Sequence, residues 1–326
     1  MASPLVIPFF TWLISLLGTR LALMLLSDFG IMDVPSARSN HTSPVPRGGG
    51  IAMVISALLF LASIGMNGSV LLAAVLLAVV SFADDLKSLP VSVRLLVQVV
   101  AVAIAASALP DHVFPAFVPH LCEGVFIALL WIWFINLTNF MDGIDGITSM
   151  QTILVSVGIC LVCESVPSLP RVLAQEAIII AVAALGFYWF NGWPAKVFMG
   201  DVGSITLGFL SGYMLLTLAM NGQWIPALIL PAYYLSDATC TLVKRFLHGE
   251  KVWQAHSLHA YQQAVRSGLS HRAVVCRISG LNVLLVMLAM VATVSMMAAV
   301  AMLIIAYGLT ACLIRSFTGH YANFPG

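Results

Sequence analysis

The chain has 326 residues, of which 61% are hydrophobic and only 8% are charged, and its mean hydropathy is +1.03. Soluble domains carry about 25% charged residues, so this composition excludes an ordinary soluble protein and predicts a polytopic membrane protein. The formal net charge is +1 and no charged tail is present, so we expect no nucleic-acid partner. Cys160 and Cys163 form a CxxC inside an apolar run without a second pair, which favours packing over zinc binding.

Apolar runs long enough to cross a membrane follow one another along the whole chain, since a span needs about 20 such residues. The first run has no basic region and no small-residue cleavage site, so we expect it to be a retained span. The expected fold is all-α, a single membrane domain over residues 1–326 with about ten or eleven spans, because the last two runs are almost continuous. The expected spans are 5–26, 48–66, 69–83, 92–110, 123–140, 147–164, 172–190, 203–220, 224–243, 279–296 and 298–314.

The basic residues predict the orientation of these spans. If the N-terminus is external, 12 of the 14 lysines and arginines lie on or near the cytoplasmic side, and only Arg20 and Arg171 do not. The cytoplasmic loops then lie near 27–47, 84–91, 139–147, 191–203 and 244–277. Most of the carboxylates fall on this same face, whereas the external loops are short. Nearly all of the polar chemistry is therefore expected on one side of the membrane.

Two of these loops carry paired carboxylates. In SFADDLKSLP (81–90), Asp84 and Asp85 end a span, and adjacent acids raise each other's pKa unless a cation or a donor compensates. Taken alone, they fit a solvated helix end equally well. In NFMDGIDG (139–146), Asp142 and Asp145 stand at i and i+3 and would share one face of a helix, which Asn139 extends by one turn. The glycines of this segment indicate close approach of backbone or ligand.

The segment FNGWPAKVFMGDVGS (190–204) precedes another apolar run. Asp201 stands between glycines, and Ser204 could cap the helix that follows. Backbone N–H groups at a helix N-terminus suit phosphate oxygens, although a simple turn would explain this segment too.

The largest cytoplasmic loop begins at Lys244 and Arg245 and contains His256 and His259 at i, i+3 spacing. A zinc pair would need a third ligand, and none is evident, so we favour anion binding in this cationic loop over metal binding. An ordinary positive-inside loop remains the alternative. In DVPSARSNHTSPVPRGGG (33–50), Arg38, His41 and Arg47 could also bind anions.

Together, several carboxylates and an asparagine meet on one membrane face beneath cationic loops. Oxygen ligands without thiolates favour Mg²⁺ or Mn²⁺. A hard cation beside basic residues suits a nucleoside diphosphate and a lipid phosphate, and the reaction class that fits is phosphoryl transfer.

These motifs, in this order, resemble those of the polyprenyl-phosphate N-acetylhexosamine-1-phosphate transferases (glycosyltransferase family 4). This family includes the peptidoglycan lipid I synthase and the enzymes that start O-antigen and enterobacterial common antigen. The resemblance runs from about Asp33 to His259, through DVPSARSNHTSPVPRGGG, FADDLKSLPVSVRLLVQ, NLTNFMDGIDG, FNGWPAKVFMGDVGS and the histidine loop. It implies transfer of a sugar-1-phosphate from a UDP-sugar to undecaprenyl phosphate at the cytoplasmic face of the bacterial inner membrane, with release of UMP. It also implies Mg²⁺ as the cofactor, with Mn²⁺ as a substitute.

The resemblance also implies residue roles. Asp84 and Asp85 would bind or deprotonate the lipid phosphate, and Asp142 and Asp145 would shape the nucleotide–metal site. Asn139 and Asp201 would approach the metal, Asn191 would lie in the nucleotide pocket, and His256 and His259 would contact the sugar or the diphosphate. We expect Lys244 and Arg245 to assist anion binding. Whether the protein forms a homodimer stays open.

One departure from the family pattern indicates which branch of the family the chain resembles more. Lipid I synthases carry three consecutive histidines followed by an acid, whereas this chain has HSLHAYQ. It therefore resembles the O-antigen-initiating branch more than the muramoyl-pentapeptide branch, and the donor stays open among GlcNAc, FucNAc and QuiNAc. The rival from another class is a cation-coupled transporter, whose acids should lie near the bilayer midplane, whereas here they stand at the ends of spans.

Overall fold

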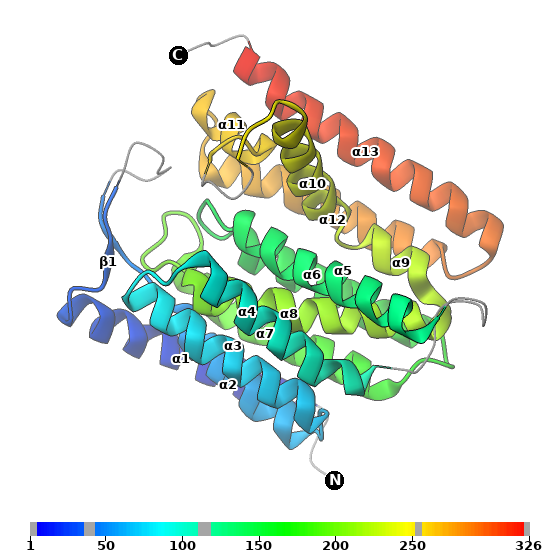
Figure 1. The fold of residues 1–326 in the computed structure, drawn as a ribbon, viewed down its shortest axis with the longest axis horizontal. Coiled ribbons are helices and arrows are strands. Elements are labelled where there is room, and N and C mark those ends of the chain that lie inside the picture. Colours follow the sequence, from blue (N-terminus) through cyan, green and yellow to red (C-terminus); the bar gives the residue numbers. More distant parts are fainter. Residues whose placement is uncertain (1–4, 36–42, 110–118, 252–255, 323–326) are drawn as a thin grey trace.

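The computed structural model describes residues 5–35, 43–109, 119–251 and 256–322. Arg38 and His41, which the sequence suggests as anion-binding residues, lie outside these ranges. The all-α polytopic membrane fold is confirmed, with two short paired strands as the only sheet in the described residues. Figure 1 shows the long helices packed side by side as one bundle. The first elements are α1 (Val6–Asp28), β1 (Met32–Asp33), β2 (Val45–Pro46), α2 (Gly50–Ser63), α3 (Gly68–Leu86), α4 (Val91–Ala105), η1 (Ala106–Ala108), α5 (His120–Phe140) and α6 (Ile147–Ser165).

The second half continues with helices only. Its elements are α7 (Arg171–Asn191), α8 (Gly200–Leu218), the π-helical turn η2 (Ala219–Gln223), α9 (Trp224–Ile229), α10 (Ala232–Leu247), α11 (Ala260–Arg266), α12 (His271–Val291) and α13 (Met296–Ala322). Within the described ranges, nine helical segments are long and apolar enough to cross a membrane, and α2 is a shorter apolar helix. These ten match ten of the eleven expected spans.

The expected span at 224–243 is wrong. In its place α9 ends at Ile229 and α10 begins at Ala232, after Pro231. Proline lacks the N–H that an α-helix needs and its ring clashes with the preceding turn, so it breaks the helix here. The apolar composition of this stretch concealed the break, because hydropathy averaged over a window does not register a single proline.

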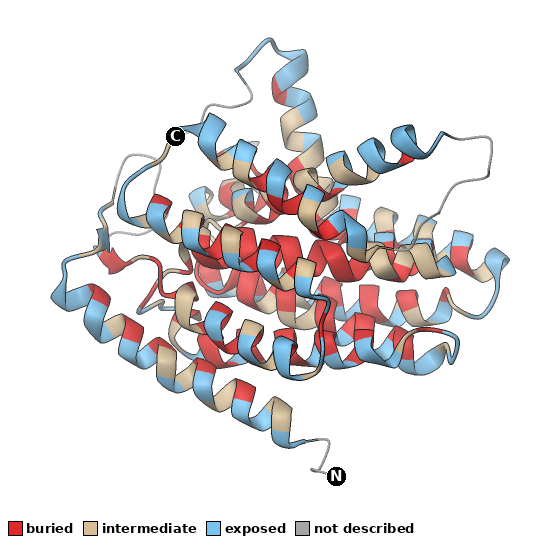
Figure 2. Cartoon of the chain, turned by 60° about the horizontal axis from the view of Figure 1, so that its bottom comes forward, coloured by how far each residue is buried: buried red, intermediate tan, exposed pale blue. Residues whose placement is uncertain are grey.

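Helix α8 is the centre of the bundle. Every side chain from 202 to 215 is buried, and α8 packs against α3 and α5. The ring of Trp131 on α5 stacks on Phe209 at 4.9 Å between centroids, and its indole N–H donates to the Phe209 carbonyl at 2.9 Å. In Figure 2 the buried residues concentrate in the middle of the molecule, whereas buried and exposed residues alternate along the outer helices. The exposed apolar faces of these helices fit contact with lipid.

The β1–β2 hairpin fastens the segment after α1 to the start of α8. Met32 pairs with Pro46 and Asp33 with Val45 in an antiparallel arrangement. The chain then runs beside the residues that precede α8, where Phe198 N–H donates to the Pro46 carbonyl at 2.8 Å and Gly49 N–H to the Phe198 carbonyl at 3.0 Å. These backbone bonds bring Arg47 and Asp33 to the N-terminus of α8.

Candidate active site

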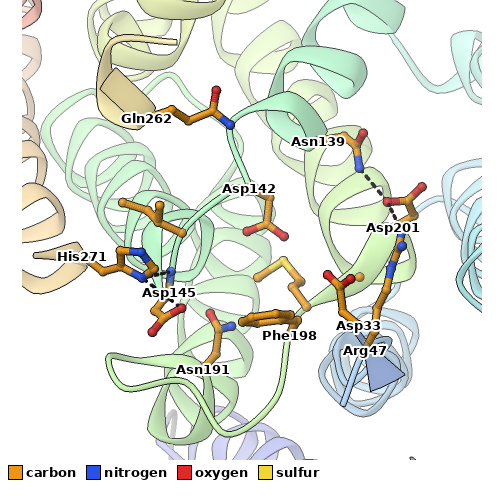
Figure 3. Close-up of a pocket in the computed structure, with 14 residues that line it drawn as sticks. Asp33, Arg47, Asn139, Asp142, Asp145, Asn191, Phe198, Asp201, Gln262 and His271 are labelled. Carbon is orange, nitrogen blue, oxygen red and sulfur yellow. Dashed lines mark hydrogen bonds and ion pairs between the residues drawn. The ribbon is translucent and has the colours of Figure 1, made fainter. Parts of the chain in front are cut away.

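A polar cavity of about 310 Å³ opens at the end of the bundle where the motifs meet. Its lining comes from the hairpin, the α5–α6 and α7–α8 connections, α11 and α12 (Figure 3). The lining residues are Asp33, Arg47, Asn139, Asp142, Gly143, Ile144, Asp145, Asn191, Phe198, Met199, Gly200, Asp201, Gln262 and His271. The structure therefore brings together six of the residues predicted from the sequence: Arg47, Asn139, Asp142, Asp145, Asn191 and Asp201.

Asp201 forms one wall of this cavity and is surrounded by donors. Its Oδ1 accepts from Arg47 Nη2 at 3.2 Å and from Asn139 Nδ2 at 3.0 Å, and its Oδ2 lies 3.5 Å from Arg94 Nη1. Asn139 also donates to Ser204 Oγ at 2.9 Å, which fixes its amide against α8. Burial lowers the pKa of Arg47, but Asp201 and Asp85 outweigh burial and hold it above its ordinary value, so this guanidinium stays charged.

Asp85 lies behind Asp201 and its side chain is fully buried. Its carboxylate accepts from the backbone N–H groups of Asp201 at 2.9 Å and Val202 at 3.0 Å, and from Arg47 Nε at 2.9 Å. It thereby satisfies donors at the N-terminus of α8 that have no partner within the helix. Gly200 precedes this contact with φ +71°, and a Cβ there would collide with the Asp85 carboxylate. Asp85 therefore fixes the start of α8 and the position of Asp201.

Asp84 is also buried but faces another neighbour. Its Oδ1 accepts from the Leu89 N–H, and its Oδ2 lies 3.3 Å from Arg94 Nη1. Neither Asp84 nor Asp85 lines the cavity. Their direct roles toward a lipid phosphate stay predictions, while Arg94 joins Asp84 to Asp201 across the back of the site.

Asp142 and Asp145 do not lie on a helix, so that part of the sequence interpretation is wrong. Helix α5 ends at Phe140 and α6 begins at Ile147, and the two acids occupy the turn between them. A right-handed helix cannot run through this turn into α6, because Gly146 has a φ of +74°. Both carboxylates nevertheless line the same cavity.

The two carboxylates have different surroundings. Asp145 Oδ2 accepts from the Ala195 N–H at 3.0 Å, and Oδ1 lies 3.1 Å from His271 Nδ1. Asp142 points toward the middle of the cavity, across from Asp201 (Figure 3). Burial raises the pKa of Asp142 to about 7, with the carboxylates of Asp201 and Asp85 adding to it and a hydrogen bond with Thr148 opposing it. Asp142 is thus a carboxyl group whose ionisation would be favoured by a cation in the cavity.

Asn191 at the end of α7 is held from both sides of its amide. Ser149 Oγ donates to its Oδ1 at 2.9 Å, and its Nδ2 donates to the Val197 carbonyl at 3.1 Å. Sequence analysis did not identify Phe198, Gln262 and His271 as parts of this lining. His271 directly follows Ser270, the residue that caps α12, but that position does not indicate the cavity.

The other predicted substrate-binding residues, His256, His259, Lys244 and Arg245, are not among the residues that line this cavity. His259 is only 2% exposed and its Nδ1 lies 3.7 Å from Asp237 Oδ1. The ring of His256 lies 4.8 Å from that of His259, and burial, with His259 and Arg245 nearby, lowers its pKa to about 4. Arg245 is buried and pairs with Glu250 at 2.7 Å, while Lys244 is exposed. Their contact with substrate stays a prediction.

Two comparisons relate the chain to known proteins. Residues 67–219 match the family model described as glycosyl transferase family 4. The chain is also 27% identical over 259 residues to the probable undecaprenyl-phosphate N-acetylglucosaminyl 1-phosphate transferase of Bacillus subtilis (strain 168), covering 74% of this chain and 72% of that protein. The segment that matches the family model contains Asp84, Asp85, Asn139, Asp142, Asp145, Asn191 and Asp201.

Proposed function

We propose that this protein transfers an N-acetylhexosamine-1-phosphate from a UDP-sugar to undecaprenyl phosphate, giving the undecaprenyl-diphosphate-sugar and UMP. The observation that carries the proposal is the cavity itself, at the end of an apolar bundle. Several carboxylates and Arg47 line it, and Arg94 lies 3.5 Å from the lining residue Asp201. Such a site can hold phosphates while the lipid chain stays beside the helices. The match to glycosyl transferase family 4 and the name of the B. subtilis relative support the same reaction class.

The cavity fits Mg²⁺ by the chemistry of its donors. Its lining offers carboxylate and amide oxygens and no thiolate. In the part of the chain that the structure describes, no three His, Cys, Asp or Glu residues form a metal cluster of their own. This pattern suits Mg²⁺, which uses one or two carboxylates and completes its shell with waters and substrate phosphates. Asp201 and Asn139 would hold the ion, and when bound it would neutralise charge on the diphosphate.

The proposed reaction is a single displacement. An oxygen of the lipid phosphate attacks the β-phosphorus of the UDP-sugar, a new P–O bond forms, and the bond from the β-phosphorus to the bridging oxygen breaks, so that UMP leaves with that oxygen. Arg47 and Arg94 provide fixed positive charge beside Asp201, where the phosphates would lie. Asp84, held by Arg94 and the Leu89 N–H, is the proposed group that accepts a proton from the lipid phosphate.

The cellular setting follows from the same proposal. The excess of lysine and arginine at this end of the bundle supports a cytoplasmic site in the bacterial inner membrane. The product would start O-antigen or a related envelope polysaccharide. HSLHAYQ supports this branch over lipid I synthesis, because it lacks the three consecutive histidines of the lipid I synthases.

One assay tests the proposal and the donor sugar together. Purified protein is incubated with undecaprenyl phosphate, Mg²⁺ and each of a panel of radiolabelled UDP-N-acetylhexosamines, with UDP-GlcNAc first because of the relative's name. We expect UMP and a lipid-linked product in equal amounts with one of the donors. UDP-MurNAc-pentapeptide as the only accepted donor would move the protein to the lipid I branch. No product with any donor would remove the transferase proposal and reopen the transporter alternative.

A further inference from the structure

A second acidic centre lies outside the cavity, on α10. Asp237 is 1% exposed and is not among the residues that line the proposed active site. Its Oδ1 accepts from the Ala260 N–H at 2.8 Å, and its Oδ2 accepts from the Tyr261 N–H at 3.3 Å. These are the first two N–H groups of α11, which have no partner inside the helix. A carboxylate from another helix thus fastens the start of α11.

The remaining contacts of Asp237 keep its carboxylate in one orientation. Tyr233 donates to Oδ2 at 3.1 Å, and Thr241 donates to Oδ1 at 3.3 Å. His259 Nδ1 lies 3.7 Å from Oδ1. A buried carboxylate is costly unless it is hydrogen-bonded, and this one has donors from α10 and from α11. The arrangement is a built junction between the two helices.

Helix α11 reaches the active-site turn from this junction. Tyr261 is completely buried and its hydroxyl donates to the Phe140 carbonyl at 3.0 Å, at the point where α5 ends and the Asp142–Asp145 turn begins. A Cβ at Gly143 would collide with the Tyr261 hydroxyl and approach Gln262 Nε2 to 3.1 Å. Gln262 itself lines the cavity (Figure 3). Tyr261 and Gln262 therefore pack against the turn at Phe140 and Gly143.

Helix α11 has only seven residues, and a helix of that length does not persist without external contacts. From this chain of contacts we propose that Asp237 is a positioning residue, which holds α11 so that Tyr261 and Gln262 fix the turn that carries Asp142 and Asp145. The inference deepens the proposed function, on which its kinetic part rests. It also explains why the histidine loop packs around Asp237: His259 precedes the first residue of α11.

The test uses the full chain in lipid nanodiscs and reads hydrogen exchange and kinetics in parallel. In Asp237→Asn the side chain keeps its shape but loses its charge and one acceptor. We expect amides 260–263 and 141–146 to exchange at least about tenfold faster, and kcat per folded protein to fall at least about tenfold. The matched control is Thr239→Val on the same helix, whose hydroxyl accepts from Trp133 Nε1 on α5 at 3.2 Å. The control should leave hydrogen exchange unchanged at both 260–263 and 141–146.

A second variant separates the two halves of the link and remains readable if Asp237→Asn does not fold. Tyr261→Phe removes only the hydroxyl that reaches Phe140, so amides 141–146 should exchange faster while those at 260–263 stay protected. The double variant should loosen 141–146 no more than Asp237→Asn alone, because both changes act on one path. Unchanged exchange at 141–146 in both single variants would overturn the proposal, and so would faster exchange there with wild-type kcat. If the wild-type protein transferred no sugar phosphate, the proposed function would fail, while the exchange data would still decide the positioning role.

Discussion

The buried carboxyl group of Asp142 should destabilise the folded protein when it is ionised. Burial raises the pKa of this carboxyl from 3.8 to about 7, which is roughly three pH units, or about 4 kcal/mol at 1.4 kcal/mol per unit. The side chain is partly open to the cavity, so we discount this figure to about 1–2 kcal/mol. A raised carboxyl pKa means that the folded state prefers the protonated form. Asp142 therefore does not destabilise the folded protein below pH 3.8, where its carboxyl is protonated in both states. The destabilisation grows as the pH rises and is complete above pH 7.

Asp142→Asn removes the ionisation and keeps the side-chain size. Without Mg²⁺ and nucleotide, we expect the variant to be about 1–2 kcal/mol more stable than the wild type at pH 8, which corresponds to a rise in Tm of a few degrees. At pH 4.5 the two proteins should be nearly equal in stability. Transfer activity should fall at least about 100-fold. Thermal unfolding in detergent with a chelator, followed by tryptophan fluorescence, measures the difference. Asp28→Asn, at an exposed carboxylate, is the control. A variant that is no more stable than the wild type at pH 8, or equally more stable at both pH values, would refute the reasoning.

Three further substitutions test the rest of the site. Arg47→Ala leaves the fully buried Asp85 without its cation, although Asp85 keeps two backbone donors and Arg47 is 36% exposed. We expect this variant to be less stable by about 1–3 kcal/mol, whereas Arg47→Lys should recover part of that loss; chemical unfolding measures both. Asp201→Asn should reduce transfer at least about 100-fold and alter the Mg²⁺ dependence, and full activity with a normal Mg²⁺ titration would remove our metal assignment. His256→Ala should raise the donor KM more than it affects unfolding, and an unchanged KM would argue against contact with the sugar or the diphosphate.

The fold and the membership of the cavity could be predicted to a large extent, because both depend on local patterns. Apolar runs of sufficient length predict ten of the helices, and polar residues between such runs must gather at the ends of the bundle. Asn139, Asp142, Asp145, Asn191 and Asp201 stand at such ends, and the structure places all five around one cavity.

The parts that the sequence could not predict depend on partners that are distant along the chain. Asp84 and Asp85 are neighbours in sequence, but one faces Leu89 and Arg94 and the other caps α8 beside Arg47. Spacing alone cannot assign these partners. His259 belongs to a conspicuous motif, yet its ring is buried beside Asp237. Asp237 also accepts from the N–H of Ala260, the first residue of α11, which follows it by 23 residues in the sequence. His271 pairs with Asp145 across 126 residues, and no local signal indicates that pairing.

Charge balance connects these contacts to the proposed chemistry. In the described part of the site, Asp84, Asp85 and Asp201 share the two guanidiniums of Arg47 and Arg94, so these three carboxylates when ionised exceed the arginines by one charge. Asp33, Asp142 and Asp145 also line the cavity and add negative charge when they ionise. A divalent cation would offset part of this excess, and it would do so where a diphosphate and a lipid phosphate bring further negative charge. The arginines alone can hold the empty site together, but they leave too little positive charge for both substrates, and for this reason we place Mg²⁺ in the reaction.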